Sequence, residues 1–104
     1  MTEEKREYQI NILRSQKGND HANYRKYMVN LYRYYERKIA ESHTDWCISS
    51  LSEMYKIITD GCHNPDCSFS SMKRYVKEIH DLGYIKDVYE DGEWHSYIIK
   101  ELDF

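Results

Sequence analysis

Basic and hydroxyl side chains recur at helical spacing between residues 70 and 77. Lys73, Arg74 and Lys77 fall on the side of a helix opposite its apolar positions, and Ser70 and Ser71 stand at its start. Ammonium, guanidinium and hydroxyl groups are the side chains that most often contact phosphate. Three basic residues by themselves could equally form a solvent-exposed helix face that binds no ligand. The pattern predicts a phosphate-binding helix.

A second basic stripe lies earlier in the chain. It consists of Lys26, Asn30, Arg33 and Arg37, with Tyr34 at its flank. A single nucleic-acid strand needs cations for its phosphates and flat rings for its unstacked bases. We therefore predict nucleic-acid contacts at Lys26, Arg33, Tyr34 and Arg37. Most of the 11 tyrosines recur at core spacing, and at most three are expected to touch a ligand.

Catalytic signatures are missing from the sequence. It has no glycine-rich phosphate loop, no nucleophile elbow and no HExxH pair. Any dyad of cysteine and histidine would have to be assembled from distant positions. We expect a non-enzymatic protein without a cofactor.

Cys62, His63 and Cys67 raise the question of a zinc site. Structural zinc usually shows Cys-x2-Cys pairs, and the spacing here is Cys-x4-Cys with one nearby histidine. We expect a metal-free loop, with zinc as the alternative. The odd total of 3 cysteines does not fit a disulfide framework, so a reducing cytoplasm is the expected location.

The chain's charge is unevenly distributed. The formal net charge is −3, but residues 1 to 41 carry +3 and residues 42 to 104 carry −6. The 104 residues suffice for one compact core, and no apolar stretch approaches the roughly 20 residues that a membrane span needs. We expect one domain at residues 21 to 104, preceded at residues 1 to 20 by an arm or short helix, and no membrane partner.

Apolar spacing and local signals predict the elements that carry these side chains. Three- and four-residue steps predict a helix over residues 21 to 41, and Ser50 with Glu53 resembles a capping box that starts a second helix ending at Gly61. Ser68 or Ser70 caps a third helix that reaches Leu82. Gly83 is the expected stop of that helix.

Two aromatic and β-branched runs, residues 84 to 89 and 94 to 100, predict a β-hairpin. Asp91-Gly92 between them favours the tight turn that needs positive φ. Glu90, Asp91 and Glu93 place three negative charges around that turn, where they repel phosphate. This acidity disfavours ordinary docking of the hairpin on duplex DNA and suits a protein partner or a mode that uses the helices alone.

The order of helix, extended segment, two helices and hairpin resembles the winged helix-turn-helix family. The likeness covers residues 45 to 100 and is carried by Ser70-Ser71-Met72, Tyr75-Val76, Ile79, Leu82-Gly83 and Tyr84-Ile85. It implies an α+β fold, with a three-helix core and a C-terminal β-hairpin wing. The connection at residues 61 to 69 is longer than the family's usual tight turn.

More narrowly, the whole chain resembles the small single-stranded-DNA-binding winged-helix proteins of staphylococcal cassette chromosome elements. That resemblance implies a role in replication or transfer of a mobile genetic element, with single-stranded DNA as the partner. Duplex DNA and replication proteins are further partners of this interpretation. A sequence-specific duplex regulator and a protein-interaction module on the same fold are the alternatives.

Overall fold

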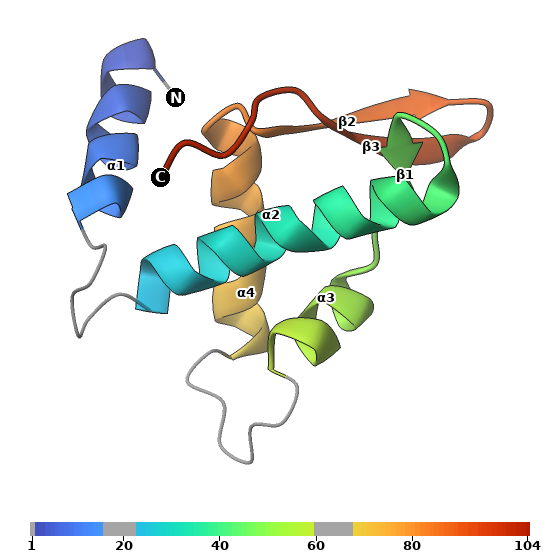
Figure 1. Cartoon of the computed structure of the whole chain (residues 1–104), viewed down its shortest axis with the longest axis horizontal. Helices are drawn as coiled ribbons and strands as arrows, with labels where there is room; N and C mark the ends of the chain where they lie inside the picture. Colours follow the sequence, from blue (N-terminus) through green and yellow to red (C-terminus); the bar gives the residue numbers. More distant parts are fainter. Residues whose placement is uncertain (1, 16–22, 60–67) are drawn as a thin grey trace.

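A computed structural model describes residues 2–15, 23–59 and 68–104 of the chain (Figure 1). Within these ranges, four helices and a three-stranded sheet form an α+β domain. In chain order the elements are α1 (Glu3–Ser15), α2 (Asn23–Ser42), β1 (Trp46–Cys47), α3 (Leu51–Ile58), α4 (Phe69–Asp81), β2 (Ile85–Glu90) and β3 (Glu93–Ile98). The layout of helices followed by a C-terminal antiparallel hairpin is consistent with a winged helix.

The apolar stripe of α2 forms the centre of the core, as its spacing predicted. Tyr27, Met28, Leu31 and Tyr35 are buried, and α2 contacts all three other helices as well as β1 and β3. Met72 and Ile79 of α4 are fully buried in the same cluster. Burying one such side chain contributes about 1.5 to 3 kcal/mol, so α2 is the element on which the others assemble.

Both ends of α4 follow the predicted local chemistry. Ser68 is the N-cap, and its Oγ accepts a hydrogen bond from the backbone N–H of Ser71 at 3.1 Å. Gly83 has a φ of 89° and donates to the carbonyl of His80, while Tyr84 N–H reaches the carbonyl of Ile79. These two bonds form a Schellman motif, which satisfies carbonyls that the helix leaves free.

The second predicted helix ends earlier than expected. Helix α3 stops at Ile58 with Thr59 as its C-cap, and the Thr59 hydroxyl donates to the carbonyl of Tyr55 at 2.6 Å. The predicted stop at Gly61 and most of the long connection to α4 lie outside the described residues.

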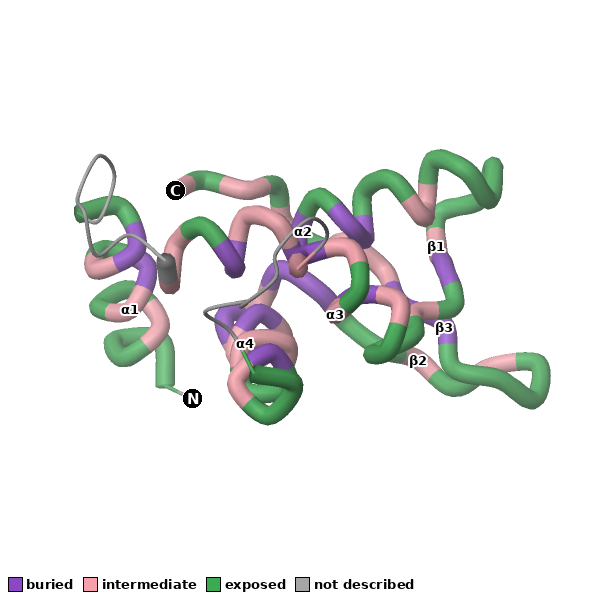
Figure 2. The backbone as a smooth tube through the Cα atoms, turned by 90° about the horizontal axis from the view of Figure 1, so that it is seen from below, coloured by how far each residue is buried: buried purple, intermediate pink, exposed green. Residues whose placement is uncertain are grey.

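The hairpin has the predicted turn. A third strand, β1, joins it to form the sheet, where the sequence indicated only a short extended segment. Asp91 and Gly92 have φ values of 54° and 82°, so they form the two-residue turn between β2 and β3. Strand β1 pairs with β3 through Trp46 and Tyr97, which gives the sheet order β1-β3-β2. The hairpin projects beyond the helices, and its tip is exposed (Figures 1 and 2).

Of the two possibilities for the N-terminal residues, the structure shows the helix. Ile10 and Leu13 of α1 are buried in the common core. Arg14 of this helix forms an ion pair with Asp103 near the end of the chain, and its guanidinium nitrogen lies 3.1 Å from Asp103 Oδ2. In the part of the chain that the structure describes, no helix has the length and apolarity to span a membrane.

The hairpin turn generates a first prediction. A Cβ at Gly92 would meet nothing within 4 Å, so Gly92→Ala introduces only the backbone strain of a positive φ. We expect it to lower the free energy of unfolding by about 1 kcal/mol, measured by urea denaturation. Asp91→Gly is the matched control and should change it by less than about 0.5 kcal/mol, because glycine adopts this conformation freely. Equal losses in both variants would contradict the assigned turn.

Candidate nucleic-acid interface

The predicted basic face of α4 is exposed. Ser70, Lys73, Arg74 and Lys77 all lie at the surface, while Met72 and Ile79 point into the core. The side chain of Lys77 is 80 % exposed. Ser71 is half-buried, and its Oγ accepts a hydrogen bond from Arg74 at 3.1 Å. The helix therefore presents the three predicted cations to solvent.

The charges of these cations are only partly compensated. Lys77 Nζ lies 3.4 Å from Asp81 Oδ2, one turn further along α4. Lys73 Nζ lies 5.7 Å from the centre of the Phe69 ring. Within residues 2–15, 23–59 and 68–104, neither Lys73 nor Arg74 forms an ion pair with a carboxylate. Both remain available to an anionic ligand.

A shallow hollow of about 360 Å³ adjoins this face. It lies between α4, the start of α3 and strand β2, and its lining comprises Leu51, Lys73, Val76, Lys77, His80, Asp81 and Asp87. His80 Nε2 lies 3.1 Å from Asp87 Oδ2, so this pair joins α4 to the sheet at the edge of the hollow. The hollow thus joins the basic face of α4 to the hairpin, with Asp81 and Asp87 beside the two lysines.

The second basic stripe is exposed but more compensated than its sequence suggested. Lys26, Arg33 and Arg37 lie at the surface of α2. Arg33 pairs with Glu36 at 2.9 Å, and Arg37 Nε lies 4.0 Å from Glu41. Arg33 and Arg37 border a groove of about 380 Å³ between α2 and α3, lined also by Asn30, Tyr34, Ile57 and Ile58. This groove is separate from the hollow beside α4.

The predicted position of Tyr34 is wrong. Its side chain was expected at the flank of the exposed basic stripe, in reach of a ligand, but the residue is only 2 % exposed and its ring packs in the core against Tyr35. A base cannot stack on a ring that is covered by protein. The apolar ring gains more from burial than from solvent exposure, because α3 covers this side of α2.

Tyr34 instead completes the start of α3. Ser50 caps the helix as predicted, accepting from the N–H of Glu53 at 3.3 Å. The reciprocal half of the capping box is not formed, because the N–H of Ser50 donates to the Tyr34 hydroxyl at 3.2 Å. That hydroxyl donates in turn to Glu53 at 3.1 Å. Burial raises the pKa of Tyr34 to about 12, which keeps the hydroxyl protonated.

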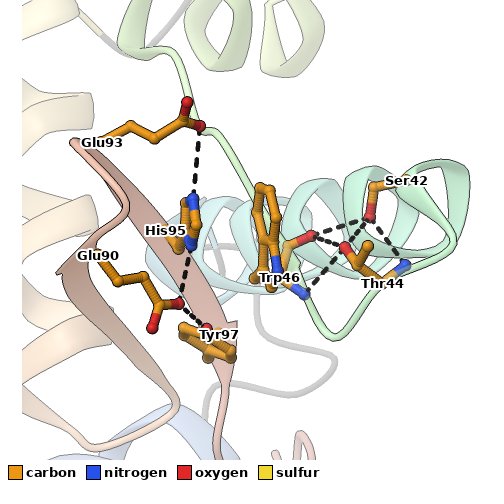
Figure 3. Close-up of polar contacts among 7 residues, drawn as sticks. All are labelled: Ser42, Thr44, Trp46, Glu90, Glu93, His95 and Tyr97. Atoms are coloured by element: carbon orange, nitrogen blue, oxygen red, sulfur yellow. Dashed lines mark hydrogen bonds and ion pairs between the residues drawn. The ribbon is translucent and has the colours of Figure 1, made fainter.

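Glu90 and Glu93, two of the three acidic turn residues, are held on one face of the sheet (Figure 3). Glu90 accepts a hydrogen bond from the Tyr97 hydroxyl and lies 2.8 Å from Nδ1 of the buried His95, while Glu93 lies 3.4 Å from its Nε2. The Trp46 ring stacks on the His95 ring, with the two ring centres 3.6 Å apart. The bond from Tyr97, followed by that from His95, holds the pKa of Glu90 below its usual range. Two of the three acidic side chains are thus engaged within the protein.

Two exposed aromatic residues were not singled out from the sequence. Tyr89 and Trp94 face each other across the hairpin, and each is 60 % exposed. Strand alternation was the available signal, because residues 87, 89, 94 and 96 share one face while 90, 93 and 95 share the other. They join the candidate interface.

The metal expectation is not tested by the structure. Cys62, His63 and Cys67 lie outside the described residues. Among the residues that are described, no group of three His, Cys, Asp or Glu side chains could hold a metal ion. Cys47 is buried, and burial raises the pKa of its thiol to about 11, so it stays a protonated core side chain.

Comparison of the chain with protein-family models, with curated proteins and with solved structures found no match. The case for a function therefore depends on the chain's own residues.

The role of Tyr34 generates a second prediction. Tyr34→Phe removes one hydroxyl with two partners and should lower the free energy of unfolding by about 1 kcal/mol, whereas Tyr34→Ala should lower it by about 3 to 5 kcal/mol. Urea denaturation followed by circular dichroism measures both. If Tyr34→Ala left the unfolding midpoint unchanged, the ring would not be part of the core.

Proposed function

We propose that this protein is a non-enzymatic winged helix-turn-helix domain that binds DNA and prefers single strands. The observation that carries the proposal is the exposed face of α4, where Lys73 and Arg74 lack carboxylate partners among the described residues and Lys77 is largely exposed. In this interpretation α4 is the DNA-contacting helix, α3 precedes it in the helix-turn-helix, and the hairpin of β2 and β3 is the wing.

The overall charge supports a single strand over a duplex. Phosphate neutralisation supplies most non-specific affinity for duplex DNA, and a net charge of −3 offers no broad cationic field. The carboxylates at the hairpin tip oppose the phosphates that a wing would follow along a duplex. A local row of cations on one helix is sufficient for the fewer phosphates of a short single strand.

The α2 stripe of Lys26, Arg33 and Arg37 has a secondary part in this proposal. Its arginines can exchange their pairing with Glu36 and Glu41 for phosphate, because exposed pairs of this kind contribute at most about 1 kcal/mol. Following the resemblance noted from the sequence, we further propose that the protein supports replication or transfer of a mobile genetic element.

Charge reversal on α4 tests the proposal. Lys73→Glu, Arg74→Glu and Lys77→Glu together should reduce affinity for a labelled single-stranded oligonucleotide at least tenfold, because three attractive phosphate contacts become repulsive. Fluorescence anisotropy at two salt concentrations measures the loss. The slope of affinity against salt should also become shallower, since fewer counterions are released.

The control variant makes the same charge change elsewhere. It carries three substitutions at exposed positions of α1, α3 and β2, namely Lys5→Glu, Lys56→Glu and Lys86→Glu. This variant should weaken binding much less than the α4 variant does. Unchanged affinity of the α4 variant, with an unchanged circular dichroism spectrum, would remove α4 from the site. Equal or tighter binding of the wild-type protein to a duplex of the same length would replace the single-strand preference with the duplex regulator.

A further inference from the structure

Tyr89 and Trp94 form an exposed aromatic pair on the hairpin. They are direct partners in the register of β2 and β3, and their ring centres lie 5.3 Å apart with the planes inclined by 63°. Each residue is 60 % exposed, and neither belongs to the buried core cluster. Two large rings held open to solvent, on paired strands, are a preformed contact surface.

Strand alternation places this pair on the sheet face that meets α4. Asp87 is two residues before Tyr89, and Ser96 is two residues after Trp94, so all four side chains share one face. Asp87 accepts a hydrogen bond from the Ser96 hydroxyl at 2.6 Å and lies 3.1 Å from His80 of α4. The aromatic pair therefore continues the surface that begins at the α4 hollow.

Two of the three acidic side chains of the tip project from the opposite face. Glu90 and Glu93 alternate with Tyr89 and Trp94 along their strands and contact His95 on the side that Trp46 covers (Figure 3). Of the carboxylates that line the α4 hollow, Asp87 accepts a hydrogen bond from Ser96 and lies 3.1 Å from His80, and Asp81 pairs with Lys77. The repulsion expected from Glu90 and Glu93 therefore acts mainly on the face opposite the aromatic pair.

The spacing of these groups fits a short stretch of single strand. Tyr89 lies about 7 Å along β2 from Asp87, which borders the same hollow as Lys73 and Lys77. Phosphates on α4 and bases on the hairpin can thus belong to the same short stretch of one strand.

We propose that Tyr89 and Trp94 are a stacking platform for unpaired bases of a strand whose phosphates lie on Lys73 and Lys77. This inference rests on the proposed function and assigns the base contacts of the same interface. Only unpaired bases present their faces to such rings, so the platform supplies the preference for single strands that Tyr34 cannot supply.

Alanine substitution of the pair tests the platform. Tyr89→Ala with Trp94→Ala should reduce affinity for a labelled oligothymidylate about tenfold or more, since base stacking contributes about 1 to 3 kcal/mol per base. Trp94→Phe should retain most of the affinity. Tyr8→Ala is the matched control, because Tyr8 is 69 % exposed on α1, and it should leave binding unchanged. The unfolding midpoint of the double variant should fall only slightly, since the pair lies outside the core and only the cross-strand ring contact is lost.

An abasic oligonucleotide of the same length separates base contacts from phosphate contacts. The Tyr89 and Trp94 variant should bind it as the wild type does, whereas the charge-reversed α4 variant should lose affinity for both oligonucleotides. If the wild type binds no single strand, the proposed function and the platform fail together. If the wild type binds and the α4 variant does not, while the double alanine variant binds oligothymidylate normally, the platform alone is overturned.

The alternative ligand of the aromatic pair is a protein surface, and analytical sedimentation of the wild type and the double variant tests it. Self-association that the double variant abolishes, together with unchanged affinity for oligothymidylate, would assign the pair to an interface with a second copy and overturn the platform. A monomer in both cases, with reduced affinity for oligothymidylate, supports it.

Discussion

The hydroxyls of the buried and half-buried tyrosines impose the main constraint on this structure, because each must find a hydrogen-bond partner inside the protein. Tyr24 donates to Glu78 and accepts from Gln9, and Tyr84 donates to Asp103. Tyr34 links Ser50 to Glu53. These partners come from α1, α3, α4 and the C-terminal segment. The same side chains that fill the core also fix which segments lie against it.

This constraint determines which charges remain for a ligand. Lys38 pairs with Glu53 at 3.1 Å, and that ammonium, followed by the Tyr34 hydroxyl, holds the pKa of Glu53 below its usual range. Arg14 and Lys100 both pair with Asp103. These cations stabilise the junctions between elements. Lys73 and Arg74 lie on the side of α4 that faces away from such junctions, and there the positive charge stays at the surface.

The hairpin shows how strand geometry divides one short sequence between two tasks. Between positions 89 and 94 the chain carries two aromatic and three acidic residues, which in sequence read as one acidic tip. Alternation across the pleat sends the rings toward the α4 side and two of the carboxylates toward His95. An interface that joins α4 to the aromatic face is therefore compatible with a hairpin whose net charge is negative.

The sequence by itself determined the local structure. Apolar spacing gave α2, α3 and α4, whereas residues 1 to 20 remained an arm or a short helix. A serine at 68 or 70 and Gly83 marked the ends of α4, and Asp91-Gly92 gave the turn, because each signal acts within a few residues of backbone. It also identified Lys73, Arg74 and Lys77 as exposed, since they oppose a clear apolar stripe.

Only the tertiary structure decided the position of Tyr34, the pairing of β1 with β3 and the two faces of the hairpin. Tyr34 lies at the edge of the α2 stripe, where 100° per residue leaves both a buried and an exposed orientation open. Its burial depends on α3, which begins 17 residues later and covers that edge. Contacts between distant segments decide such positions, and periodicity within one segment carries no information about them.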